Sequence, residues 1–99
     1  MKPVDPDLRP VEGPEANEEL SSLAKAIAHP ARVQIVRILQ ERSSCTCGQL
    51  VEELSFAQST VSQHLAMMKE AGLLGTGPAG DYHLEPRALR RLRALIGAL

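Results

Sequence analysis

The chain has 99 residues and a formal net charge of −1, and its 43% apolar side chains include only two aromatic ones, Phe56 and Tyr82. This length suits one domain, whose core we expect to consist of Leu, Ile, Val and Ala at helical spacing. No apolar run approaches the roughly 18 residues that span a bilayer, which excludes a membrane protein. The acidic start differs from a secretory signal, so we expect a cytoplasmic protein with reduced thiols.

Residues 1–15 form a proline-rich segment without apolar periodicity. They hold four prolines and one glycine, and we expect a disordered, acidic arm there. Residues 1–19 carry six acidic and two basic side chains, a net charge of −4, whereas residues 20–99 carry nine basic and six acidic ones, a net charge of +3. The folded domain, residues 16–99, is therefore compatible with nucleic-acid binding.

Two helices are predicted in the first half of the chain. The first begins near residue 16 and places Leu20, Leu23 and Ile27 on one face. Pro30 suits the first turn of the second helix, which follows His29 in the stretch HPARVQIVRILQER. The inward residues of this second helix are expected to be Ile35, Val36, Ile38 and Leu39, and its polar side to hold Arg32, Gln34, Arg37 and Glu41.

A short helix over about residues 47–54 is predicted next, preceded by both cysteines in the stretch SSCTCGQL. Thr46 and Gln49 have the spacing of a capping box, in which each side chain satisfies a backbone N–H group of the first turn. A break, SFA, separates this helix from a longer one over about residues 58–71, which Gly72 ends. The apolar face of the longer helix is Val61, Leu65 and Met68.

The last part of the chain predicts a hairpin and a final helix. Residues 73–76 and 81–84 flank GPAG, which is typical of a hairpin turn. Pro86 then begins a helix with leucines on one side and, on the other, Arg87, Arg90, Arg91 and Arg93. The order of about five helices with one small β-hairpin is that of a winged helix-turn-helix in a mostly α protein.

The helix that begins near residue 58 carries a polar face suited to DNA. In a helix-turn-helix the second helix presents its N-terminal turns to base edges. Gln can pair with adenine through two hydrogen bonds, and Ser or Thr can contact a base or a phosphate. An ordinary solvated face would be equally polar, but the preceding turn and following hairpin favour DNA binding. The candidate residues are Gln58, Ser59, Thr60, Ser62, Gln63 and His64, with Lys69 for phosphate.

Three stretches, LAKAIAHPARVQIVRIL, CTCGQLVEEL and QSTVSQHLAMMKEAGLL, resemble the ArsR/SmtB family of bacterial winged-helix repressors. The resemblance covers about residues 20–99. It implies a homodimer formed through the first and last helices, binding of an inverted-repeat operator in double-stranded DNA, and release by an effector. The long apolar stripes of the first and last helices fit such a dimer.

Two features depart from the family pattern. Ala57 stands where many relatives have a Ser N-cap, which costs about 1 kcal/mol of helix stability unless Ser55 or a backbone shift substitutes. The predicted wing has no Lys or Arg, so we expect Lys69, Arg32, Arg37 and the helix N-termini to provide more of the salt-dependent affinity.

Cys45 and Cys47 flank the predicted N-cap, where backbone N–H groups stabilise a thiolate, the ligand that soft ions prefer. The resemblance implies an effector site, because arsenite, cadmium and lead sensors of the family bind their ions through a Cys-x-Cys pair here. The remaining family ligands are missing, since Leu50 stands where some arsenite repressors have a third cysteine. The last helix also lacks the His and carboxylate ligands of zinc sensors.

Three interpretations of the cysteines therefore stay open. They bind trivalent arsenic or antimony with a solvent or borrowed ligand, they sense oxidants or electrophiles, or they are small packing residues. We predict no required cofactor and no enzyme, because the sequence has no βαβ unit, paired carboxylates, Ser/His/Asp set or phosphate-binding loop. A winged helix used only for protein contacts is the remaining alternative.

Overall fold

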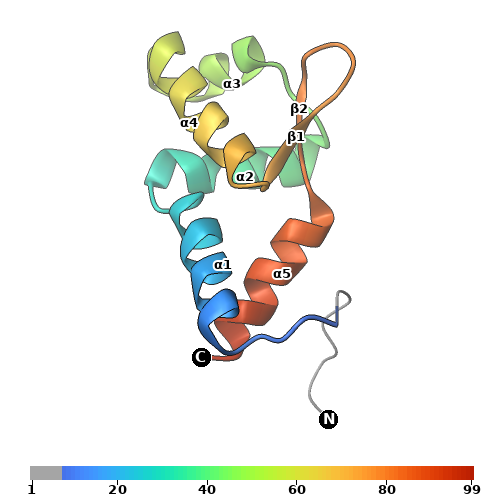
Figure 1. The fold of residues 1–99 in the computed structure, drawn as a ribbon. Helices are drawn as coiled ribbons and strands as arrows, with labels where there is room; N and C mark the ends of the chain where they lie inside the picture. The colour runs from blue at the N-terminus through green and yellow to red at the C-terminus, as the bar shows by residue number, and fades with distance from the viewer. Residues whose placement is uncertain (1–7) are drawn as a thin grey trace.

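The computed structural model describes residues 8–99 and contains two groups of elements (Figure 1). At one end of the molecule, α1 and α5 lie side by side, and the other elements form the opposite end. The elements in chain order are α1 (Pro14–Lys25), α2 (Pro30–Arg42), α3 (Cys47–Glu53), α4 (Gln58–Glu70), β1 (Leu74–Thr76), β2 (Tyr82–Leu84) and α5 (Pro86–Gly97).

The observed order confirms the winged helix-turn-helix. Strands β1 and β2 pair antiparallel, with Gly75 opposite His83. A further bridge joins Cys45 to Tyr82 through two backbone hydrogen bonds of 3.0 and 2.7 Å. The segment that precedes α3 is therefore fixed to the wing, which the sequence pattern did not indicate.

Helix starts follow their local sequence. Pro14, Pro30 and Pro86 occupy the first turns of α1, α2 and α5, where a missing N–H group is harmless. The side chain of His29 caps α2, because its Nδ1 accepts a hydrogen bond of 3.0 Å from the amide of Ala31. The short helix α3 needs its own cap most, since seven residues form few internal hydrogen bonds.

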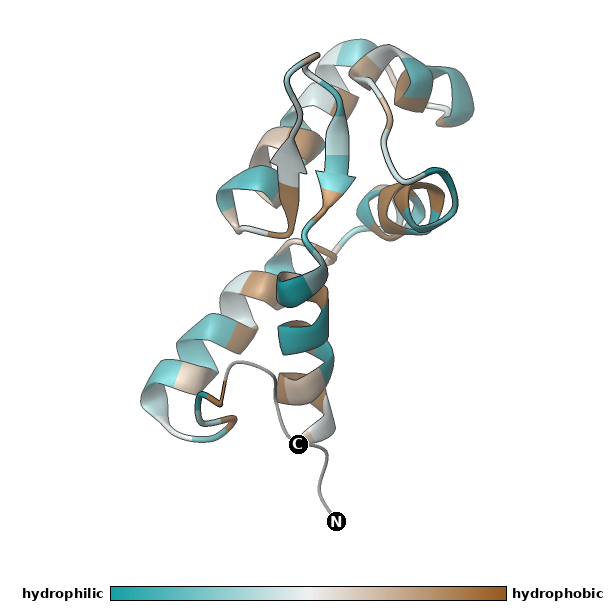
Figure 2. Ribbon diagram, turned by 90° about the vertical axis from the view of Figure 1, so that its right-hand side faces the viewer, coloured by the Kyte–Doolittle hydropathy of each residue, from teal (hydrophilic) through white to brown (hydrophobic). Residues whose placement is uncertain are grey.

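Two apolar clusters hold the fold together. The larger lies beneath the helix-turn-helix and includes Ile35, Leu50, Val61 and Leu65, all fully buried. The smaller lies between α1 and α5 and contains Ala16, Leu23, Leu92 and Leu95. Figure 2 shows hydrophobic and hydrophilic segments alternating along the helices, as expected when each helix buries one face. Because the two clusters lie at opposite ends of the molecule, the fold is elongated, with extents of 42 × 21 × 20 Å.

The arm and α5 differ from the prediction in two ways. Helix α1 begins at Pro14, two residues earlier than expected, and residues 1–7 of the predicted disordered arm lie outside the described residues. Arg91, which we placed on the polar side of the last helix, is only 2% exposed. The helical pattern was wrong for this residue because a polar network, rather than solvent, surrounds its guanidinium.

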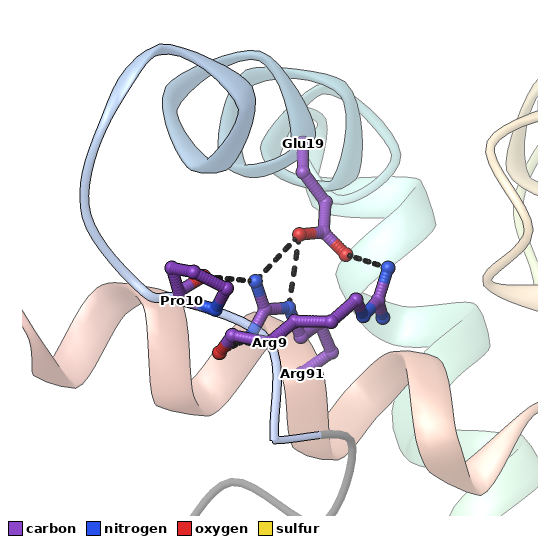
Figure 3. A network of polar contacts seen from close by, with 4 residues as sticks. All are labelled: Arg9, Pro10, Glu19 and Arg91. Carbon is purple, nitrogen blue, oxygen red and sulfur yellow. Dashed lines mark hydrogen bonds and ion pairs between the residues drawn. The ribbon is translucent and has the colours of Figure 1, made fainter.

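This network fixes the chain before α1 against α5 (Figure 3). Arg91 binds the Glu19 carboxylate at 2.8 and 2.9 Å and donates to the carbonyl oxygens of Arg9 and Pro10. Glu19 also pairs with Arg9 at 3.2 Å. We call these four residues the arm clamp. Within residues 8–99, no helix is both long and apolar enough to cross a membrane.

Candidate nucleic-acid interface and thiol pair

Helix α4 is held against α3 by a short turn, as in a helix-turn-helix. Leu54, the C-cap residue after α3, is buried at 4% exposure, while Val61 and Leu65 bury the inner face of α4. The N-cap position of α4 is Ala57, whose side chain makes no capping hydrogen bond. The N-cap residue of α4 therefore provides no side-chain acceptor for the first N–H groups of this helix. These groups lie at the end of α4 that would face DNA.

Most predicted DNA-contact residues are on the open side of α4. The two that are partly buried, Thr60 and His64, lie toward the protein. Because polar side chains on successive exposed positions can reach one groove, the exposed set forms a continuous candidate surface. It consists of Gln58, Ser59, Ser62, Gln63 and Lys69.

His64 faces the start of α2 instead of pointing freely toward DNA. Its Nδ1 accepts a hydrogen bond of 3.0 Å from the Nε of Arg32. Its ring lies 4.6 Å from that of His29 and 6.4 Å from that of Phe56, measured between centroids. Burial, followed by the charges of His29 and Arg32, lowers the pKa of His64 below its ordinary 6.5.

Arg32, which we expected to contribute to phosphate binding, has two protein acceptors in the structure. Its Nη1 donates to the carbonyl oxygen of Lys25, at the last turn of α1, while its Nε is bonded to His64. The sequence pattern placed Arg32 on a solvated side, but these two acceptors come from neighbouring helices. Arg37, in contrast, is exposed on α2 as predicted.

The wing is tight and carries no Lys or Arg side chain between residues 74 and 84. The Gly77 amide donates to Asp81 at 2.8 Å, and the Gly80 amide donates to Gly77 at 3.0 Å. Gly80 has a φ of +78°, which only glycine adopts easily. Since the wing has no Lys or Arg, the prediction that the helices provide most phosphate contacts stays a prediction.

The predicted capping box at the start of α3 is confirmed. The Gln49 amide donates to the Thr46 hydroxyl at 3.1 Å, and the Thr46 amide donates to the Gln49 side chain at 2.9 Å. Both cysteines are free thiols, and they have different surroundings. Cys45 belongs to the larger core cluster at 2% exposure, whereas Cys47 is partly buried beside that cluster.

Each cysteine is connected to one part of the candidate DNA-binding surface. The Cys47 sulfur lies 3.5 Å from the Ser62 hydroxyl on α4. The Cys45 backbone forms the bridge to Tyr82 of the wing. Among residues 8–99, no group of three or more His, Cys, Asp or Glu side chains is arranged to hold a metal ion. The assignment of Cys45 and Cys47 as ligands stays a prediction.

A winged helix-turn-helix with an exposed polar second helix is typical of DNA-binding regulators. Residues 29–75 match the family described as "Bacterial regulatory protein, arsR family". The chain is 33% identical over 69 residues to an HTH-type transcriptional regulator of Methanocaldococcus jannaschii, covering 70% of this chain and 78% of that protein. The chain belongs to the ArsR family, whose members are DNA-binding transcriptional repressors and not enzymes.

Two further similarities involve arsenical resistance. The "Arsenical resistance operon repressor" of Staphylococcus xylosus is 31% identical over 67 residues, which span 68% of this chain and 64% of that protein. A crystal structure described as "Possible transcriptional regulator for arsenical resistance" is 32% identical and has a TM-score of 0.69, covering 78% of this chain and 81% of that one. The structural similarity, which covers 78% of this chain, supports the winged helix-turn-helix fold.

Proposed function

We propose that the protein represses transcription as a homodimer bound to an inverted-repeat operator, and that trivalent arsenic or antimony bound by Cys45 and Cys47 releases it. The observation that carries this proposal is the position of the two thiols. They flank the Thr46 cap, and Cys47 contacts Ser62 on the proposed DNA-reading helix.

DNA binding is supported by the open polar side of α4. Its exposed glutamines can pair with base edges, and Lys69 can neutralise a phosphate. Two copies of α4 in a twofold dimer would read half-sites about one helical turn apart, roughly 34–36 Å.

Dimerisation is supported by apolar side chains left uncovered on the α1 and α5 end of the molecule. Ile96 is 47% exposed and Leu99 is 90% exposed, although both continue the apolar side of α5. A second copy that packs against this end would cover them and join the first and last helices of both chains. Sedimentation at micromolar concentration tests this, because a monomer would contradict the proposed operator geometry.

Effector release follows from where the sulfurs lie. Because Cys45 is buried, an ion that binds both sulfurs must displace that side chain from the core. The displacement would strain the Cys45 bridge to Tyr82 and the intervening Thr46 cap. It would also remove Cys47 from Ser62, so both α4 and the wing would lose their position. The two arsenical-resistance relatives favour arsenite or antimonite over other soft ions.

An operator-release assay tests the effector. Fluorescence anisotropy on a promoter duplex is measured with arsenite, antimonite, cadmium, zinc and peroxide, using wild type, Cys45→Ser and Cys47→Ser. Both variants should bind DNA and lose the arsenite response, whereas the exposed control Ser44→Ala should respond like wild type. If both cysteine variants respond normally, the thiols are only packing residues.

A thiol redox or electrophile sensor is the second candidate. Cys47 favours it, because this free thiol is partly accessible at a helix N-terminus. Peroxide in the same assay distinguishes the two, since release by peroxide without release by arsenite would support redox sensing. A winged helix that serves only protein contacts would instead show an affinity for DNA that ignores both sequence and salt.

A further inference from the structure

One guanidinium connects three helices at the start of α2. Arg32 lies in the first turn of α2, its Nη1 binds the Lys25 carbonyl of α1, and its Nε binds His64 of α4 at 3.0 Å. Helix α1 belongs to the end of the molecule opposite the DNA-reading surface, and α4 carries that surface. Arg32 therefore ties the end of α1 directly to α4.

Aromatic rings enclose the His64 end of this connection. The His29 ring lies 4.6 Å from the His64 ring, and Phe56, from the turn before α4, meets both rings edge-on at 6.2 and 6.4 Å. His29 is itself fixed, because its Nδ1 caps α2. Moving His64 away from Arg32 would therefore break several ring contacts as well as one hydrogen bond.

The connection depends on the protonation state of His64. A ring nitrogen that accepts a hydrogen bond carries no proton, and arginine remains charged at any ordinary pH. Among the described residues, the charged or titratable groups in contact with His64 are Arg32 and His29, both from the start of α2. The turn before α4 contributes Phe56, and the Lys25 carbonyl of α1 contacts Arg32. Burial, followed by the charges of His29 and Arg32, lowers the pKa of His64 and so disfavours its protonated form.

We propose that Arg32 is a positioning residue for operator binding, which holds α4 at its DNA-reading angle by joining the end of α1 to neutral His64. The proposal rests on the proposed function only in that α4 reads the operator. When Nδ1 is protonated, it cannot accept from Arg32, and two cations face each other. The Arg32–His64 hydrogen bond, which we call the joint, then breaks. Helix α4 leaves its DNA-reading angle, and the affinity for the operator falls without any effector on the thiols.

The pH dependence has a definite direction. Because the pKa of His64 in the folded protein is lowered from 6.5, the contribution of the joint is complete above pH 6.5 and is lost as the pH falls through the lowered pKa. An additional positive charge raises non-specific attraction to DNA at the same time. The diagnostic quantity is therefore the ratio of operator affinity to scrambled-duplex affinity, which should fall in acid.

The test measures this ratio by anisotropy between about pH 5.5 and 8 at constant ionic strength. His64→Asn retains a neutral acceptor close to the position of Nδ1, so it should keep the ratio of the wild type at neutral pH and lose the decrease in acid. Arg32→Met removes the donor but keeps the length of the side chain. It should lower the operator affinity about fivefold or more at neutral pH and also remove the decrease in acid.

Two controls separate positioning from other roles. Arg37→Met removes an exposed charge from the same helix, and it should reduce the salt slope without changing the pH profile. Arg32→Met should leave the salt slope unchanged, because a positioning residue releases no counterion. His29→Asn keeps a capping acceptor and should retain the decrease in acid.

The outcomes decide the proposal. If the affinity ratio of Arg32→Met depends on pH as that of wild type does, the proposal is wrong. If His29→Asn loses the decrease of this ratio in acid, the pH dependence belongs to the α2 cap, and the proposal is also wrong. A nuclear magnetic resonance titration without DNA adds an independent measurement. The chemical shift of the Arg32 Nε–H group should change over the same pH range in which His64 is protonated. If the shift does not follow His64 protonation, the proposed Arg32–His64 contact is wrong, even where operator binding is intact. If the Arg32 signal follows His64 protonation but the wild type does not bind its operator at neutral pH, the proposed function is contradicted instead.

Discussion

Replacing Arg91 by Met tests whether the arm clamp stabilises the fold. The Arg91 side chain is 3% exposed, and it is bonded to Glu19, which retains 24% exposure. Met preserves most of the apolar stem of Arg91 and removes only the guanidinium. Glu19 would then keep its ion pair with Arg9, whose side chain is 56% exposed.

The magnitude follows from the burial of the two partners. Removing one partner of a fully buried ion pair costs about 3–5 kcal/mol, because an uncompensated charge remains. Glu19 can reach water and still has Arg9, so the cost is smaller. We expect Arg91→Met to lower the free energy of unfolding by about 2–3 kcal/mol, within the range of charged hydrogen bonds.

Urea unfolding followed by circular dichroism measures this difference at a fixed protein concentration, because dimerisation would otherwise shift the midpoint. Hydrogen exchange of the amides before α1 should also accelerate, since the carbonyls of Arg9 and Pro10 lose their donor. Arg93→Met, an exposed change on the same helix, should alter stability by less than about 0.5 kcal/mol. If Arg91→Met matches this control in both measurements, the clamp does not hold the arm.

Three further changes probe helix ends by urea unfolding. Thr46→Ala should cost about 1 kcal/mol by removing the capping box, whereas Thr46→Ser should cost much less; equal losses would exclude capping as the cause. Ala57→Ser should stabilise the protein by about 0.5–1 kcal/mol by adding the absent cap of α4, and no gain would show that water already satisfies those amides. Gly72→Ala should cost about 1 kcal/mol, because φ is +84° there although a Cβ would meet no atom within 4 Å; an unchanged stability would contradict the strain.

Elements defined by neighbouring residues were predictable. The apolar spacing of α2 and α4, the prolines at helix starts and the Thr46 capping box all depend on positions within a few residues of one another. These local rules were enough to predict a winged helix-turn-helix, the position of both cysteines beside the α3 cap and the polar face of α4. They also identified Ala57 as an uncapped helix start.

Polar partners that come from distant segments were not predictable. The pattern placed Arg91 and Arg32 on solvated helix sides, but Arg91 meets Glu19, which is 72 residues away, and Arg32 meets His64, which is 32 residues away. Likewise, nothing near Cys45 indicated its backbone bridge to Tyr82. Helical periodicity tells which residues share a face, whereas the helix that covers this face depends on how all the elements pack. The sequence by itself therefore determined the elements and the candidate DNA and thiol residues, and the tertiary structure decided which polar side chains are free to contact DNA and which are held by another helix.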